Sequence, residues 1–94
     1  MADHDPRGDA ELLMATPEDV EAFGVFYRRH VRWVLGFLAR RLGDAELAAD
    51  VTSEVFAAAL LASRRYDPAR GAPNIWLYGI VTSKLGSAAK RWRG

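Results

Sequence analysis

The 94-residue chain has no cysteine, only two histidines and no long apolar run. Without cysteine there is no disulfide framework and no thiolate metal site, and the isolated His4 and His30 do not form a metal-binding motif. No apolar stretch approaches the roughly 18 residues of a membrane span. No apolar segment follows a basic start, as it would in a signal peptide. The sequence therefore predicts a soluble intracellular domain with no metal, cofactor or membrane contact.

Catalytic signatures are also missing. No glycine-rich loop opens a helix after a strand, so no phosphate cradle is indicated. The serines lack a neighbouring histidine that could act as a base. Asp50 and Glu54 form a carboxylate pair four residues apart, but nothing in the sequence supplies a pocket that would raise one pKa. We therefore do not expect an enzyme.

What the chain does have is a strong division of charge. Residues 1–27 hold seven acidic residues and one arginine, a net charge of −6, whereas residues 28–94 hold twelve basic and five acidic residues, a net charge of +7. An acidic lead before a basic body is compatible with binding to a polyanion. The alternative is that the arginines only solvate helix faces.

Hydrophobic periodicity predicts an all-α fold. Residues 1–13 are polar, acidic and aperiodic, and we expect them to be a disordered lead. Thr16-Pro17 is a helix start signal and Gly43 a C-cap signal, and they bracket the first helix. Its apolar stripe comprises Val20, Phe23, Tyr27, Val31, Val34, Leu35, Leu38 and Leu42.

Two further helices complete a predicted three-helix bundle. Asp44 can cap the second helix, and a loop at residues 66–74 separates it from a third helix that Pro73 can open. The second helix has a core stripe of Leu47, Ala48, Val51, Val55, Ala58, Ala59 and Ala62. The third has Leu77, Ile80, Val81, Leu85, Ala88 and Trp92. No strand-like alternation and no repeat appear.

Two surfaces are candidates for function. On the second helix, Asp50, Ser53 and Glu54 project to one side. Phe56 and Leu60 lie off the core stripe, so apolar surface is expected beside acidic surface, as protein interfaces require. The alternative for the acidic residues is a solvated face.

The loop and third helix carry the opposite sign, with basic residues on both sides of Trp76 and Tyr78. Basic groups neutralise phosphates, and aromatic faces stack on unpaired bases. The alternative is that the aromatic residues belong to the core. Because Leu77, Ile80 and Val81 already define the core stripe, we expect at least one of the two aromatic side chains to lie partly outside it.

Residues 23–93 resemble region 2 of sigma-70 family factors, specifically the extracytoplasmic-function (ECF) group. The chain matches an aromatic-Tyr-basic-basic opening at residues 26–29 and a Leu-Gly-Asp-Ala-Glu turn at residues 42–46. Residues 50–56, Asp-Val-Thr-Ser-Glu-Val-Phe, stand where the family has Asp-Leu-Val-Gln-Glu-Val-Phe, and an aromatic-Asp-Pro-x-Arg-Gly loop begins at residue 66. Residues 76–83, Trp-Leu-Tyr-Gly-Ile-Val-Thr-Ser, stand where the family has Trp-Leu-Tyr-x-Ile-Ala-x-Asn. Five pieces in the correct order and spacing carry the resemblance.

The resemblance implies two sets of site residues. Those implied to dock on the β′ clamp helices of RNA polymerase are Asp50, Ser53, Glu54 and Phe56. Those implied to bind the −10 promoter element, as a non-template single strand with one base flipped into the loop, are Arg65, Tyr66, Asp67, Asn74, Trp76, Ser83, Lys84, Ser87 and Arg91. Ser53 replaces the usual Gln of the docking motif, and Ser83 replaces the usual Asn near the −10 strand.

The resemblance also implies a cytoplasmic, non-enzymatic initiation factor with RNA polymerase core, promoter DNA and an anti-sigma factor as partners. Residues 14–94 are expected to form sigma domain 2, and the domain that would recognise a −35 element is expected to be absent from this chain. Two alternatives stay open. One is a helical protein-interaction bundle that is bound by an anti-sigma factor and does not bind DNA independently. The other is a duplex-binding helix-turn-helix module, against which the long loop before the basic helix argues.

Overall fold

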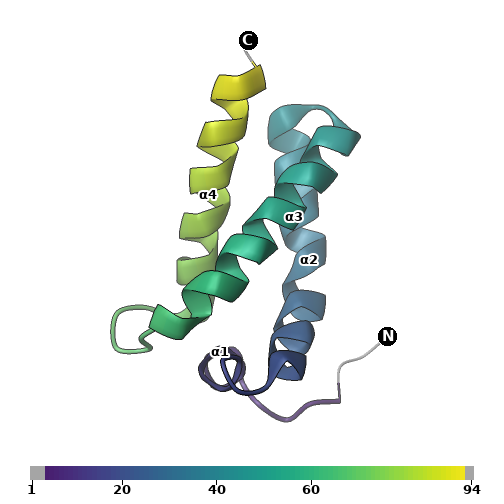
Figure 1. Cartoon of the computed structure of the whole chain (residues 1–94). Helices are drawn as coiled ribbons and strands as arrows, with labels where there is room; N and C mark the ends of the chain where they lie inside the picture. The colour runs from purple at the N-terminus through teal and green to yellow at the C-terminus, as the bar shows by residue number, and fades with distance from the viewer. Residues whose placement is uncertain (1–3, 93–94) are drawn as a thin grey trace.

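The computed structural model describes residues 4–92, except for the side chain of Trp92. Its elements are α1 (Asp9–Ala15), α2 (Val20–Leu42), α3 (Ala45–Ala62), the 3₁₀ turn η1 (Ser63–Arg65) and α4 (Pro73–Trp92) (Figure 1). No strand occurs within the described residues. The predicted all-α class is confirmed, with one α-helix more than the three that were expected.

The additional helix corrects the expectation of a disordered lead over residues 1–13. Residues 9–15 form α1, and the side chains of Leu12 and Leu13 are completely buried. Residues 1–3 lie outside the described part of the chain. At seven residues α1 is too short to show helical periodicity, and a helix of this length is marginal in isolation. Its burial in the bundle is what stabilises it.

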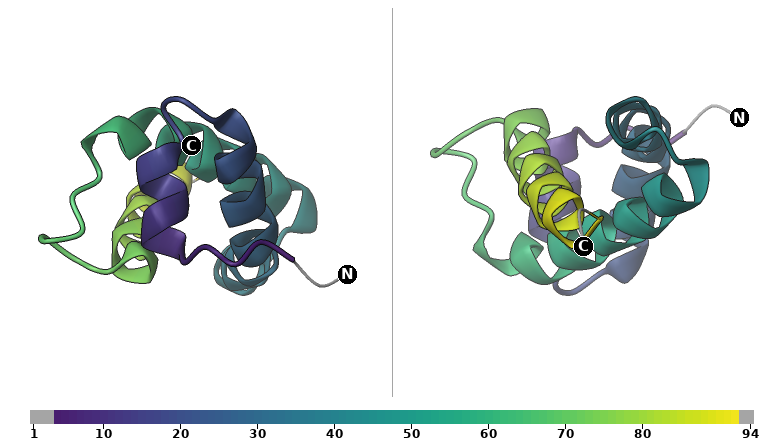
Figure 2. Two further views of the ribbon diagram at one scale, coloured as in Figure 1. Left: turned by 90° about the horizontal axis from the view of Figure 1, so that it is seen from below. Right: turned by 90° about the horizontal axis from the view of Figure 1, so that it is seen from above.

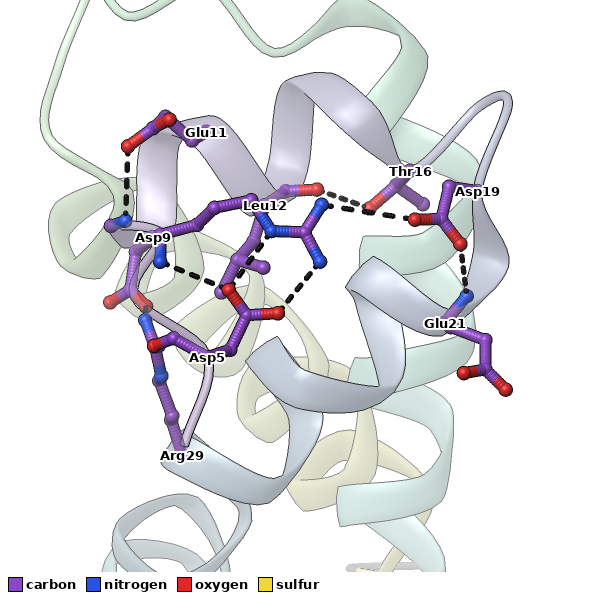
Figure 3. Close-up of polar contacts among 10 residues, drawn as sticks. Asp5, Asp9, Glu11, Leu12, Thr16, Asp19, Glu21 and Arg29 are labelled. Carbon is purple, nitrogen blue, oxygen red and sulfur yellow. Dashed lines mark hydrogen bonds and ion pairs between the residues drawn. The ribbon is translucent and has the colours of Figure 1, made fainter. Parts of the chain in front are cut away.

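A polar network fixes α1 to α2, and Figure 3 shows the part of it in which Arg29 lies beside Asp9 and Asp5. The Asp9 carboxylate pairs with Arg29 at 3.1 Å and accepts a hydrogen bond from His30 Nε2 at 2.8 Å. Trp33 Nε1 donates to His30 Nδ1 at 2.8 Å. Because an indole N–H can only donate, Nδ1 accepts this hydrogen bond and Nε2 is the ring nitrogen that faces Asp9. Arg29 also donates to the carbonyl of Asp5, which ties the residues before α1 to the bundle.

The start of α2 differs from the expected Thr16 cap. Asp19 is the N-cap, and its side chain accepts from the N–H of Glu21 at 3.1 Å. Thr16 instead ends α1, where its hydroxyl donates to the carbonyl of Leu12 (Figure 3). The C-terminal prediction is confirmed, because Gly43 adopts a left-handed conformation with φ 67° and caps α2. Glycine reaches this conformation without steric cost.

The three long helices pack around one core, with α3 in contact with both α2 and α4. The two views along the bundle show α1 lying across the end at which α2 and α4 begin and α3 ends (Figure 2). The buried apolar side chains are Leu12, Leu13, Ala22, Phe23, Phe26, Val34, Leu38, Ala48, Val51, Val55, Phe56, Ala59, Tyr66, Leu77, Val81 and Ala88. The core thus extends from α1 through all three long helices.

The predicted core stripes are largely confirmed on α3 and α4, whereas the stripe on α2 and the placement of Phe56 need correction. Val20, Tyr27 and Leu35 are 66%, 41% and 39% exposed, and Phe26, outside the predicted stripe, is fully buried. Phe56 was expected on a second, outward apolar face. It is buried, because its ring packs edge-on against Phe23 and Tyr27 at centroid distances of 6.5 and 4.9 Å. Trp92 was also expected in the core, but its side chain is not described.

Candidate nucleic-acid and protein interfaces

The loop between η1 and α4 is a defined turn. Asp67 accepts the N–H of Arg70 through its carbonyl and the N–H of Ala69 through its side chain, at 3.0 and 2.9 Å. Asp at the first position and Pro68 at the second are the residues that such a turn favours. The Tyr66 hydroxyl donates to the carbonyl of Gly71 at 2.9 Å and closes the loop. The backbone of the loop is therefore held in place by its own sequence.

Tyr66 is well suited to this closure. Its ring is buried and packs edge-on against Trp76 at 5.4 Å, and Trp76 packs in turn against Phe26 at 6.4 Å. Burial, and then the neighbouring carboxylates of Asp67 and Asp9, raise the pKa of the Tyr66 phenol. The phenol therefore stays protonated and keeps its role as a hydrogen-bond donor.

A pocket of about 340 Å³ lies between this loop and the start of α4. It is lined by Arg65, Tyr66, Asp67, Arg70, Gly71, Ile75 and Trp76. Its volume falls within the range of small-molecule sites and provides room for a planar ring the size of a nucleobase. It combines two aromatic rings, two guanidinium groups and one carboxylate, which are the groups that stack on bases and bond to their edges.

Four of the nine predicted DNA-binding residues meet in this pocket, namely Arg65, Tyr66, Asp67 and Trp76. Asn74 does not line it and lies exposed in the first turn of α4. Ser83 and Ser87 are exposed further along α4, and Lys84 is half-buried between them. The expectation about the aromatic pair is confirmed. Trp76 is half-buried, and Tyr78 is 45% exposed and packs against Phe37 outside the pocket.

The sequence reasoning missed three lining residues: Arg70, Gly71 and Ile75. Arg70 and Gly71 belong to the matched loop motif, so the motif itself was the signal that could have identified them. Ile75 is 66% exposed at the pocket wall and carried no signal in the sequence. An exposed isoleucine becomes informative only once its neighbours are known.

The acidic face of α3 has the predicted residues but lacks its expected aromatic anchor. Asp50 and Ser53 are exposed and Glu54 is half-buried, all on one side of the helix. Phe56 lies in the core, so it cannot present an apolar surface beside them. Its ring instead packs against the ring of Tyr27 on α2, which is partly exposed. The outward apolar residues of α3 are Leu60 and Leu61, which are 38% and 76% exposed.

The two predicted surfaces meet between α3 and α4. A groove of about 290 Å³ is lined by Leu47, Asp50, Glu54, Ala88 and Arg91. Within it, Arg91 Nη2 lies 3.4 Å from Glu54 Oε2. Figure 1 shows the start of α3 and the end of α4 at the same end of the bundle, opposite the loop. A residue predicted to bind DNA is thus paired with one predicted to bind polymerase.

The family model for sigma-70 region 2 matches residues 26–93 of the chain. The chain belongs to the sigma-70 region 2 family. The ECF RNA polymerase sigma factor SigK of Mycobacterium sp. (strain KMS) is 30% identical to it over 73 residues, which are 78% of this chain and 38% of that protein. The protein of the same name from strain JLS, and the RNA polymerase sigma factor SigK from strain MCS, align with the same values. No solved structure matches the chain.

This result confirms the family assignment made from the five motifs, and the match to ECF factors confirms the group. The sigma-70 family consists of non-enzymatic initiation factors, in agreement with the lack of catalytic signatures. The chain spans well under half the length of these curated relatives. The matched region begins at Phe26, so α1 and the first turns of α2 lie before it.

Two general properties complete the description of residues 4–92. No helix there is both long enough and apolar enough to cross a bilayer. Within the same residues, no group of three or more histidine, cysteine or acidic side chains is arranged to hold a metal ion.

Proposed function

We propose that this chain is the promoter-recognising domain 2 of an ECF sigma factor, which binds the −10 element as a melted single strand and docks on the RNA polymerase core to direct transcription initiation. The observation that carries the DNA-binding part is the pocket between the loop and α4. A flipped base needs a cavity, a stacking surface and polar groups at its edge. The pocket offers Tyr66 and Trp76 for stacking, and Arg65, Asp67 and Arg70 at its wall.

The pocket favours a single strand over a duplex. A helix-turn-helix module reads the major groove with a helix that follows a turn of about three or four residues. Here α4 is preceded by the longer loop from Tyr66 to Ala72, and this loop folds into a pocket wall. A base can enter this pocket only after it has left the stack, at a cost of a few kcal/mol that the contacts must offset.

Binding to single-stranded and duplex −10 oligonucleotides across a salt series tests this part of the proposal. We expect preference for the single strand and a steep decrease of affinity with salt, because phosphate contacts release counterions. Lys84→Ala should weaken binding to every oligonucleotide alike and flatten the salt slope by about one unit. Equal affinity for duplex and single strand would contradict the proposal.

The acidic face of α3 supports docking on a basic partner. Asp50 and Glu54 are one helical turn apart and reach the same side, and Ser53 lies between them. We propose that this face contacts the β′ clamp helices. Glu54→Lys should weaken binding to the polymerase core while the helical circular dichroism spectrum is retained. Glu21→Lys, a charge reversal at an exposed position in the first turn of α2, is the matched control. If Glu54→Lys binds the polymerase core as tightly as the wild type, this face is not part of the interface.

A second candidate function is that of a protein-interaction bundle, sequestered by an anti-sigma factor. One observation favours it. A hollow of about 290 Å³, where α1 joins α2 and α3 ends, is lined by Thr16, Pro17, Val20, Leu60, Leu61, Ser63 and Arg64. Val20 and Leu61 are 66% and 76% exposed there, an apolar surface that suits a protein partner. A chain that binds neither form of the oligonucleotide would favour this candidate.

A further inference from the structure

The contact between Glu54 and Arg91 joins two surfaces with different proposed partners. Glu54 lies on the acidic face of α3 and Arg91 near the end of α4, 37 residues later in the chain. The two charged groups are 3.4 Å apart across the groove that Asp50 also lines. While this pair is formed, the Arg91 guanidinium is directed toward a carboxylate and not toward a phosphate.

We propose that Glu54 holds Arg91 in an autoinhibitory ion pair, and that a basic side chain of the docking polymerase replaces Arg91 on Glu54 and frees it to bind the DNA backbone. This inference rests on the proposed function, since it needs Glu54 in one interface and Arg91 in the other. It adds a link between them: each partner strengthens binding of the other because both compete against the same internal contact.

The exposure of the pair makes this exchange feasible. The side chains of Arg91 and Glu54 are 61% and 39% exposed, so water screens their attraction. Exposed ion pairs of this kind change an equilibrium by a factor of about 1.4 to 5. A contact this weak is displaced by a partner that brings its own basic group, yet it is strong enough to be measured. Asp50 in the same groove adds a second carboxylate that attracts such a group.

The position of Arg91 gives its release a consequence for DNA. Lys84 lies seven residues earlier, which is two helical turns and the same side of α4. A freed Arg91 therefore extends a basic row along this helix. A guanidinium can bind a phosphate through two parallel hydrogen bonds. By linkage, the factor by which polymerase improves DNA binding must equal the factor by which DNA improves polymerase binding.

The DNA part of the test uses this chain without polymerase and a fluorescently labelled single-stranded −10 oligonucleotide. Glu54→Gln removes the charge with little change in shape and should tighten binding about two- to fivefold, because Arg91 is released. Glu46→Gln removes one charge from the same helix outside the groove and should have a smaller effect. In an Arg91→Gln background, Glu54→Gln should give only the small gain seen with Glu46→Gln.

The polymerase part predicts a change in the opposite direction. Arg91→Gln, which weakens DNA binding, should tighten binding to the polymerase core about two- to fivefold, because Glu54 no longer has an internal partner. Lys90→Gln, a neighbouring charge loss in the last turn of α4, is the matched control. A loss of structure would weaken both activities and could not produce this opposition.

Three results would overturn the inference. The first is a gain for Glu54→Gln no larger than that for Glu46→Gln, and the second is an undiminished gain in the Arg91→Gln background. The third is core binding by Arg91→Gln that is no tighter than core binding by Lys90→Gln. In each case a wild-type chain that binds the oligonucleotide leaves the proposed DNA function intact. A wild-type chain that binds no oligonucleotide overturns that function and this inference together.

Discussion

The two ends of α4 are built in different ways. At its start, Trp76 packs between Phe26 and Tyr66, and the adjoining loop is closed by the hydrogen bond from Tyr66 to Gly71. At its end, the groove beside α3 is bridged by one exposed ion pair, between Glu54 and Arg91.

Because the two ends are built differently, we expect the pocket and the ion pair to respond differently to substitution. The aromatic side chains of the pocket are held by packing against the core, so the pocket is present before any ligand binds. Little free energy is therefore lost in ordering these side chains on binding. The groove depends on a solvated contact that another charged group can replace. We therefore expect substitutions at the first end to alter stability and binding together. Substitutions at the second end should alter the balance between partners with little loss of stability.

The largest effect is expected in the core at the first end of α4. Leu77 is fully buried next to Trp76 and anchors α4 against the core. Leu77→Ala should lower the free energy of unfolding by about 2–5 kcal/mol, a large share for a domain of this size. Thermal or urea unfolding measures it. Tyr78→Ala, at the adjacent exposed position, should cost less, and an equal cost would contradict the proposed register of α4.

The next effect sharpens the description of the pocket as a stacking site. Trp76→Ala should lower single-strand affinity by about 1–3 kcal/mol for all oligonucleotides, the value of one stacking contact. Fluorescence anisotropy at a temperature at which the variant is folded measures it. Trp76→Phe keeps an aromatic face and should retain most of the affinity. A loss confined to one sequence would mean that Trp76 reads a base edge and does not act as a stacking platform.

A smaller effect distinguishes the loop from the helix as the source of base preference. Asp67 lines the pocket, whereas Asn74 is exposed on α4 outside it. Asp67→Asn keeps an oxygen that can accept the N–H of Ala69 and removes the charge. It should change discrimination at one base position by about 1 kcal/mol, the net value of a typical hydrogen bond.

Asn74→Ala should affect that discrimination less. The measurement is the affinity for a set of singly substituted oligonucleotides. If Asn74→Ala has the larger effect, the base is read from the first turn of α4 and not from the loop.

The smallest effect concerns the segment before α1, which lies at neither end of α4. The hydrogen bonds from the Arg7 side chain and backbone hold the pKa of Asp5 well below its ordinary value of 3.8. A depressed carboxyl pKa means that its contribution to stability is present above the ordinary value and is lost as pH falls through the lower, folded-state pKa.

The amide 1H and 15N signals of Arg7, whose N–H donates to Asp5 Oδ1, should therefore keep their positions from pH 7 to pH 4 and shift only in stronger acid. Asp5→Asn should shift them at neutral pH as well. Signals of Asp5→Asn that match the wild type at pH 7 would show that the Asp5–Arg7 contact does not order this segment.

Much of the fold followed from local rules that the sequence states directly. The Gly43 cap, the Asp44 cap and Pro73 at the start of α4 depend on backbone geometry that particular residues favour. The stripes containing Val51, Val55, Leu77 and Val81 follow from helical periodicity. A base-binding loop was expected only through the resemblance to the family, which the order of five motifs carried.

Only the tertiary structure decided which apolar residues are buried and which charged residues become neighbours, because helical periodicity does not distinguish them. Phe23, Phe26 and Phe56 are equally apolar in the sequence, and only packing determines that all three are buried while Tyr27 is partly exposed. Helix α1 is too short to be recognised from helical periodicity, and it forms because Leu12 and Leu13 fill one end of the bundle. The contact between Glu54 and Arg91 joins residues far apart in the chain, and no local pattern encodes it. The sequence by itself determined the helices and their caps, because those interactions reach only a few residues. Packing between helices decided which faces meet and which charges become neighbours.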